Sequence, residues 1–339
     1  MNRPAAPIRS SLLLGLALVF STPPHLHAQE RLPAETIQSE SITPTLEQQI
    51  RVYLNGLAPQ LAEPDADLRK RTRRELVGPL NRPDATEAFQ TTYSLIAAEA
   101  LEPLLESDDF ATRLNAIIAV SELYTVQALD LASEALDDAN PAVRYWAARC
   151  YQDVGNRIEI STADVQRYIN ALATALATET NDPTAIRIID ALGAYNDPEA
   201  ISRLINALIN REDDSLSADE RALTACFQWL IRSRAEGLDI ESLLAETTAL
   251  AIAKSRIAIS QLIQDPETPN AAELIRITDQ ILGLTRNTFF PNTPTPDSLA
   301  GNLARSNWAT LNQDLDTWAA LMIEPAIGLS DSARDALTP

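Results

Sequence analysis

The stretch that decides the fold is residues 140–155, with the sequence NPAVRYWAARCYQDVG. Asn140 is a residue type preferred at helix caps, and Pro141 stands at the first helical position, where its fixed φ suits the helix. The apolar side chains that follow share one helical face: Val143, Ala147, Cys150 and Val154. The stretch therefore predicts an amphipathic helix with a defined start and one face turned to a core.

Apolar residues recur at helical spacing along almost all of the chain from Pro44 onward. The clearest stripe consists of Ile201, Leu204, Ile205, Leu208 and Ile209, and others lie within 46–61 and 165–176. Cap residues precede a proline at Asp182-Pro183, Asp197-Pro198 and Asp265-Pro266, and residues 217–220 (SADE) have the pattern of a capping box. No segment alternates as a strand would. Together these patterns predict an all-α fold in which antiparallel helix pairs stack on one another.

Residues 140–155 resemble the first helix of a HEAT repeat, in which a cap-proline turn leads to a Val-Arg pair, an Ala-Ala pair and a small-apolar end with glycine. Weaker copies begin at Asp109, Asp182 and Asp219, so the resemblance covers about residues 108–235. The corresponding arginines are Arg113, Arg144, Arg187 and Arg221, which lie 31, 43 and 34 residues apart. Helix-pair repeats have periods of about 30 to 47 residues. Tetratricopeptide repeats are the alternative, but their tryptophan, glycine and tyrosine pattern is missing.

The resemblance implies a right-handed HEAT-like solenoid of helix pairs with an extended concave surface for protein partners. Elementary packing agrees with this expectation, because one helix pair cannot bury its apolar stripe alone and stacked neighbours can. A non-repetitive helical domain is the alternative that the residues leave open.

The first 28 residues have the three parts of a secretory signal. Arg3 and Arg9 form a positive start, Leu12 to Phe20 is an unbroken apolar run, and Ala28 ends a stretch typical of a cleavage site. The run is shorter than the roughly 20 residues that a membrane span needs. We expect cleavage after Ala28 and a periplasmic or secreted protein. An uncleaved membrane anchor is the alternative.

The remaining chain divides by its patterns into five segments. These are a flexible tether at 29–43, an N-terminal helical cap at 44–107, HEAT-like repeats at 108–288, a proline-rich turn or linker at 289–298 and a C-terminal helical segment at 299–339. The tether is expected because its residues are polar and lack periodicity.

Composition excludes several classes of function. The 339 residues include 27 Lys and Arg against 47 Asp and Glu, for a formal charge of −20, and loss of the leader would remove two arginines and leave −22. Such acidity disfavours nucleic acid as a partner. The two histidines, His25 and His27, both lie in the leader. The mature chain therefore lacks the imidazole of Ser-His-Asp and Cys-His catalysis and of histidine zinc sites.

Candidate catalytic groups are scarce. Adjacent acids occur at 108–109, 137–138 and 213–214, each at a predicted helix end, where capping explains them. The lysines are Lys70 and Lys254, and neither belongs to a Ser-x-x-Lys motif. Lys254, on an apolar helix, is expected to snorkel to the surface. Trp308 and Trp318 could line a sugar groove but fit helix cores better. No catalytic, cofactor-binding or metal-binding residue is predicted.

Two functions from different classes follow. The first is an exported, non-catalytic HEAT-like scaffold that binds a protein partner through its concave helical face, without nucleic acid and without stable membrane insertion after cleavage. The second is a small all-helical enzyme that uses paired carboxylates on a polysaccharide, which would require two convergent acids about 5–10 Å apart. The oligomeric state is left open.

One basic cluster interrupts the acidic sequence: Arg69, Lys70, Arg71, Arg73 and Arg74. Like charges at i, i+4 on a helix repel by a few tenths of a kcal/mol, so an offsetting interaction is expected. Asp65, Asp67, Glu75 or acids of the adjacent helix could neutralise the cluster internally. Alternatively, the cluster is a partner-binding site for an acidic protein, a second copy of the chain or an anionic polymer.

The two cysteines, Cys150 and Cys226, each lie on an apolar helical stripe. They are about two repeats apart, whereas a disulfide requires Cα atoms within about 7 Å. We therefore expect both thiols to be core residues without a bridge between them.

Overall fold

The computed structural model describes residues 31–155, 158–211, 215–296, 298–323 and 327–338. Within these ranges the secondary structure is helical and contains no strand, which confirms the all-α prediction. The leader with its cleavage position after Ala28 and the acids at 213–214 lie outside the described residues.

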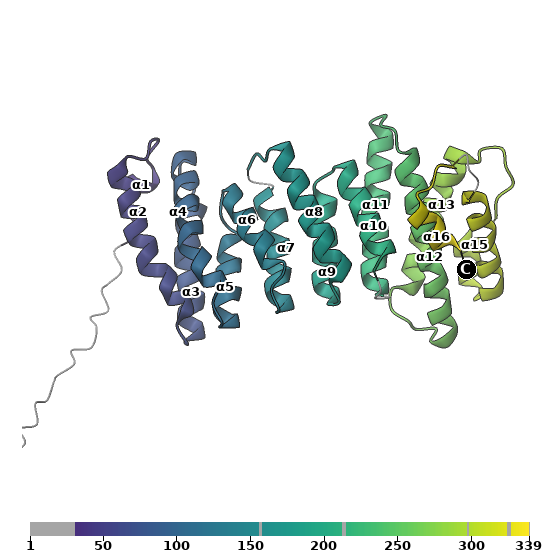
Figure 1. Ribbon diagram of the computed structural model, residues 1–339, viewed down its shortest axis with the longest axis horizontal. Helices are drawn as coiled ribbons and strands as arrows, with labels where there is room; N and C mark the ends of the chain where they lie inside the picture. Colours follow the sequence, from purple (N-terminus) through teal and green to yellow (C-terminus); the bar gives the residue numbers. More distant parts are fainter. Residues whose placement is uncertain (1–30, 156–157, 212–214, 297, 324–326, 339) are drawn as a thin grey trace, which may run out of the picture. The chain divides into compact units, whose positions relative to one another are not determined.

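The helices follow one another with short connections (Figure 1). In the first half they are α1 Ala34–Ile37, α2 Pro44–Leu57, α3 Ala66–Val77, α4 Glu87–Leu105, α5 Phe110–Val120, α6 Val126–Ala135, α7 Pro141–Gly155 and α8 Thr162–Thr178. In the second half they are α9 Asp182–Ala194, α10 Pro198–Ile209, α11 Leu216–Ala235, α12 Glu241–Gln264, α13 Ala271–Phe289, α14 Leu299–Ala304, α15 Trp308–Met322 and α16 Asp331–Leu337. Two 3₁₀ turns, η1 Ala58–Ala62 and η2 Gly78–Asn81, flank α3.

Two layers of helices account for most of the packing between residues 32 and 338. Helices α3, α5, α7, α9, α11 and α13 each pack against the next in this order, and we call them the α7 layer. Helices α2, α4, α6, α8, α10 and α12 do the same and form the α4 layer. Consecutive helices contact each other across the layers, as in α6 with α7 and α8 with α9. This is the predicted stack of antiparallel helix pairs, a HEAT-like α-solenoid with irregular ends.

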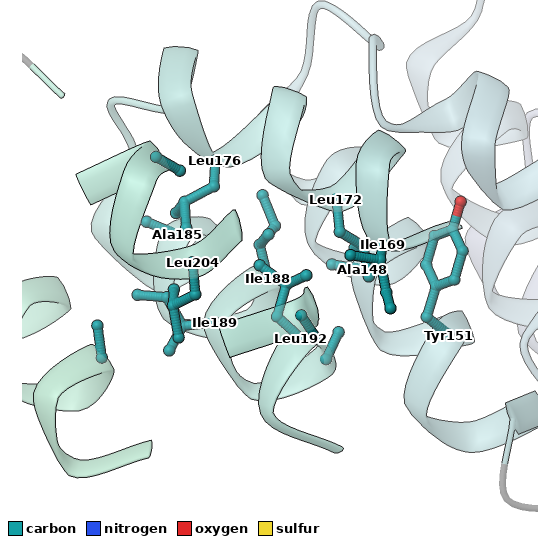
Figure 2. Close-up of a cluster of buried hydrophobic side chains, with 14 of the residues drawn as sticks. Ala148, Tyr151, Ile169, Leu172, Leu176, Ala185, Ile188, Ile189, Leu192 and Leu204 are labelled. Carbon is teal, nitrogen blue, oxygen red and sulfur yellow. The ribbon is translucent and has the colours of Figure 1, made fainter. Parts of the chain in front are cut away.

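The core between the layers consists of the stripes that the sequence indicated. Val143, Ala147, Cys150 and Val154 of α7 are all buried. Figure 2 shows Ile169, Leu172 and Leu176 of α8 beside Ile188 and its neighbours on α9. Replacing one such leucine by alanine typically lowers the free energy of unfolding by about 2–5 kcal/mol. The loss has two parts, the transfer free energy of the removed atoms and the cost of the cavity that they leave. The stripes therefore fix which face each helix turns inward.

The predicted helix starts are partly correct. Asn140 and Asp197 accept hydrogen bonds from the amides of Ala142 and Glu199, so α7 and α10 begin as expected. At Asp182-Pro183 the cap is instead Asn181, which accepts from the Thr184 amide. The capping box at 217–220 is wrong, since Ser215 caps α11. Asp265-Pro266 starts no helix, because Pro269 has no N–H to bond the Asp265 carbonyl, and α13 begins at Ala271.

The two ends of the stack differ from expectation in one place. Residues 32–43 are not a free tether: Ile37 is buried, and its carbonyl accepts a hydrogen bond from the Thr86 amide at 3.2 Å. A few apolar side chains in a polar stretch were enough to pack it against α4. At the other end, α13 stops at Phe289, where the proline-rich stretch begins, and Trp318 is buried against Phe290, so it lines no sugar groove.

Cys150 and Cys226 are both buried, and neither forms a disulfide. The Cys150 thiol lies 3.6 Å from the Ala128 carbonyl, to which it donates. Burial raises the pKa of Cys226 to about 12. The prediction of two core thiols is confirmed.

Candidate functional site

Three arginines occupy one structural position in successive helices of the α7 layer. Arg69, Arg113 and Arg144 each lie four residues after the cap of their helix, and each donates through Nη1 to the carbonyl six residues earlier, at 2.8 Å. Arg113 also binds Asp138 at 2.6 Å, and Arg144 binds Glu179 at 2.7 Å. These acids precede the next helix of the layer, so we call the two pairs the arginine ladder.

Two of the four arginines that the sequence aligned as equivalent do not belong to the ladder. Ala185 stands at the ladder position of α9, and Arg187 lies two residues later, where it donates to Tyr145 Oη at 2.8 Å. Arg221 pairs with Asp190 instead. The expected equivalence of Arg187 and Arg221 with Arg113 and Arg144 is therefore wrong. Counting from the cap residues would have found the ladder from the sequence.

Hydrogen bonding sets the charge state of the ladder acids. Burial alone would raise the pKa of Asp138 and Glu179, but the hydrogen bonds from Arg113 and Arg144 and from backbone amides outweigh it. Both pKa values therefore lie below their ordinary range. Because the Glu179 side chain is only 1% exposed, the Arg144 pair is the more deeply placed of the two.

The basic cluster of α3 is divided by these contacts. Arg69 is held by the Glu63 carbonyl, since Ser107 stands where a ladder acid would be. Arg73 donates to Asn115 Oδ1 of α5 at 2.7 Å, and burial together with the Arg74 charge lowers its pKa. Arg73 therefore joins α3 to α5, and Arg69 joins the start of α3 to the segment before it.

Lys70, Arg71 and Arg74 remain on the exposed side of α3, and we call them the basic patch. Arg74 follows Lys70 by four residues and Arg71 by three, so the three charges are neighbours on the helix. Among the described residues none of them forms an ion pair, and the acids expected to neutralise them do not. Asp65, the nearest of those acids, caps α3 by accepting from the amides of Asp67 and Leu68.

A groove opens in the α4 layer, with a volume of about 850 Å³. Its walls come from the first half of α4, the start of α6 and the segment before α8. The lining side chains are Glu87, Gln90, Thr91, Leu95, Tyr124, Thr125, Val126, Gln127, Ile158 and Glu159. A smaller hollow of about 290 Å³ lies between α2, η1 and the end of α4. No feature of the sequence pointed to either.

A buried ion pair joins α11 to α12. Lys254 Nζ lies 3.2 Å from Asp219 Oδ1, and their side chains are 7% and 0% exposed. Lys254 therefore does not snorkel as predicted. The sequence did contain a signal for this pair, because Asp219 and Lys254 each interrupt an otherwise apolar stripe of their helix. Such a pair fixes which faces of the two helices meet, because either charge alone would be costly to bury.

Metal sites, membrane-spanning helices and paired carboxylates are three further features that could carry a function. In the described ranges, no three His, Cys, Asp or Glu side chains are grouped so that they could hold a metal ion. None of the described helices combines the length and apolar character that crossing a membrane requires. Of the adjacent acids, Asp109 caps α5 and Asp138 belongs to the arginine ladder. Among the described carboxyl groups with a shifted pKa, Glu246 is the one whose pKa is raised. Burial raises it, and a hydrogen bond with Ser330 partly opposes this effect.

Comparisons with known proteins bear on the fold. Residues 132–224 match the family model for HEAT repeats. Among curated proteins none matches. A solved structure of an engineered protein covers 68% of this chain and 98% of its own length, at 17% identity and a TM-score of 0.38. Kap121p covers 89% of this chain at 12% identity and a TM-score of 0.41, with 36% of Kap121p matched.

The family match and the arrangement of the helices agree on the fold. The matched residues run from α6 into α11 and include the Arg144–Glu179 pair. The chain therefore contains HEAT repeats, matched over residues 132–224, within a stack of antiparallel helix pairs.

Proposed function

We propose that this protein is an exported, non-catalytic scaffold that holds a protein partner against its helical stack. HEAT-repeat stacks suit protein binding because they present long, continuous surfaces. In this proposal the α4 layer forms the concave face that holds the partner, and the basic patch, on α3 of the α7 layer, is a separate docking point for an acidic partner. Export rests on the leader pattern in residues 1–28.

The basic patch is the observation that carries the proposal. In a chain of net charge −20, three neighbouring cations are exposed without an ion pair to any described residue, whereas Arg69 and Arg73 of the same helix bond to the Glu63 carbonyl and to Asn115. Like charges at this spacing repel, so a bound partner that offsets the repulsion would be favoured. An acidic protein surface, including that of a second copy, does so.

Charge removal tests the docking. In the variant Lys70→Gln, Arg71→Gln, Arg74→Gln, we expect partners captured from the native envelope fraction to be lost while thermal stability is unchanged. Arg73 is left intact, because its bond to Asn115 belongs to the fold. The matched control replaces the exposed Arg232, Arg234 and Arg305 by Gln and removes the same charge elsewhere.

Salt dependence adds a second readout. Binding through the basic patch should weaken sharply between low and physiological ionic strength, as the Debye length falls to about 8 Å. If the triple variant retains every partner, or if the control loses them equally, the patch does not dock a partner and that part of the proposal is wrong.

Export has its own test. N-terminal sequencing of the native protein should give Gln29 as the first residue, in a periplasmic or extracellular fraction. A native chain that begins at Met1 or Asn2 would contradict cleavage and leave the alternative of an uncleaved anchor.

A further inference from the structure

The groove in the α4 layer exists because one helix of that layer is short. Helix α6 has 10 residues, whereas its neighbours α4 and α8 have 19 and 17. At 1.5 Å per residue, α6 is about 15 Å long, and the first half of the longer α4 lines the groove beside it. That half includes Leu95, which is 36% exposed. The groove is thus a built feature of the stack.

The lining combines two kinds of side chain. Leu95, Tyr124, Val126 and Ile158 supply apolar surface, and Gln90, Thr91 and Gln127 supply amides and a hydroxyl. Glu87 and Glu159 are the charged members, both exposed, and neither forms an ion pair or hydrogen bond with any described residue. Among the described lining residues there is no cation. The described lining is therefore a mixture of apolar and polar side chains with two carboxylates that have no described partner.

Two hydrogen bonds hold the walls that α4 and the turn before α6 provide. Ser94 Oγ of α4 accepts a hydrogen bond from the Tyr124 amide at 2.9 Å, which joins the turn before α6 to α4. Gln90 Nε2 donates to the Leu80 carbonyl at 3.1 Å. A pre-formed wall lowers the conformational entropy that a ligand must overcome.

We infer that this groove binds an extended segment of a partner polypeptide in which lysine or arginine alternates with apolar side chains. Apolar side chains of the segment cover Leu95 and Val126, and its cations meet Glu87 and Glu159. Charge complementarity selects this occupant: an acidic segment would bring like charges against the two carboxylates, and a purely apolar one would leave them beside a dry surface. Peptide amides and carbonyls can pair with Gln90, Thr91 and Gln127. This inference rests on the proposed function, in which the partner is a protein.

A random library of displayed dodecapeptides, selected on the mature full chain, tests the chemistry directly. We expect enriched peptides to combine Lys or Arg with Leu, Ile, Phe or Trp, and their binding, followed by fluorescence anisotropy, to weaken as salt is raised. Selection without enrichment of basic residues, or no enrichment over the empty support, would overturn the inference.

Groove variants locate the binding. Glu87→Gln with Glu159→Gln, and separately Leu95→Arg, should each weaken the enriched peptides about tenfold or more. The controls are Glu102→Gln with Glu106→Gln, which removes two exposed acids from the other end of α4, and Ile263→Arg, which alters an exposed apolar residue of α12. Circular dichroism verifies that all variants are folded. Equal affinity in groove and control variants would show that the peptides bind elsewhere.

The two proposals fail separately. If the basic-patch variant loses its partners while the groove variants bind peptide as the unaltered chain does, the groove inference is wrong and the scaffold function stands. If the peptides need the groove but no protein partner depends on either surface, the scaffold function is wrong.

Discussion

Two regions of the stack use the same layered packing but join their helices differently. From α5 to α9, the arginine ladder connects successive turns at the rim of the α7 layer, where the guanidinium groups are partly exposed. From α11 to α13, polar contacts lie inside the helix interfaces. They are the Asp219–Lys254 pair, Thr248 with Thr285 at 2.7 Å and Ser255 with Thr278 at 2.9 Å.

This difference shows that apolar stripes alone do not set the order of helices in such a stack. A rim contact tolerates loss of its acid, because water can solvate the partly exposed guanidinium group that remains. An interior contact does not, because its remaining partner is left in a low-dielectric core. We therefore expect unequal sensitivity to equivalent substitutions, with the α11–α13 region the more sensitive.

The largest effect is expected at the buried ion pair. Lys254→Ala leaves the Asp219 carboxylate buried without its cation, and the free energy of unfolding should fall by about 3–5 kcal/mol. Urea unfolding followed by far-UV circular dichroism measures this. The double variant Asp219→Leu, Lys254→Met removes both charges and should recover most of the loss. A single variant as stable as the unaltered chain would refute the contrast between the regions.

A smaller effect is expected at the ladder. Glu179→Gln removes the charge-assisted bonds from Arg144, which should cost about 2 kcal/mol at neutral pH, since bonds to charged groups contribute about 1.5–3 kcal/mol. Glu199→Gln serves as the control, because its pair with Arg203 is exposed on both sides and should contribute less than about 0.5 kcal/mol. If both substitutions cost the same, the ladder is an ordinary surface pair.

Acid should abolish the effect of the ladder. The pKa of Glu179 in the folded chain lies below its ordinary value of 4.5, so its stabilisation is fully present above that value and is lost as the pH falls through the lowered pKa. The difference in unfolding free energy between the unaltered chain and Glu179→Gln should therefore shrink from about pH 4.5 downward. A difference that persists at about pH 2 would mean that hydrogen bonding to the neutral acid suffices.

The smallest effect is expected at the buried hydroxyls. Thr285→Val leaves the Thr248 hydroxyl without its cross-helix partner, although that hydroxyl still donates to the Leu244 carbonyl, so we expect a loss of about 1 kcal/mol. Thr288→Val is the control, since its hydroxyl donates to the Leu284 carbonyl of the same helix. Thermal melts of Thr285→Val, of Thr248→Val and of the double variant that carries both changes measure the coupling. The double variant should lose less stability than the two single variants together.

The sequence predicted what local rules determine. The stripe of α7 and the caps at Asn140 and Asp197 were correct because a cap, a proline and an apolar face act within a few residues of one another. Where a second local rule intervened, the prediction failed. Asp265-Pro266 has the same pattern as Asp197-Pro198, but Pro269 follows it and blocks the first turn.

The candidate site was predictable only in part. The spacing of the basic cluster placed its charges on neighbouring helical faces, but the Glu63 carbonyl and Asn115 decide which of them remain exposed. Neither contact has a local signal in the cluster itself. The groove depends on the length of α6 relative to α4 and α8, and the buried ion pair on how α11 meets α12, so both required the packed structure.

The two buried thiols give each region its own chemical reporter. Cys150 lies in α7 beside the ladder, and Cys226 lies in α11 of the more sensitive region. Because the thiolate is the reactive form and burial holds the pKa of Cys226 near 12, an alkylating reagent or oxidant can attack it only when that part of the stack opens. Alkylation of each cysteine, timed by mass spectrometry on the unmodified protein, therefore measures the opening rates of the two regions side by side, without any engineered label.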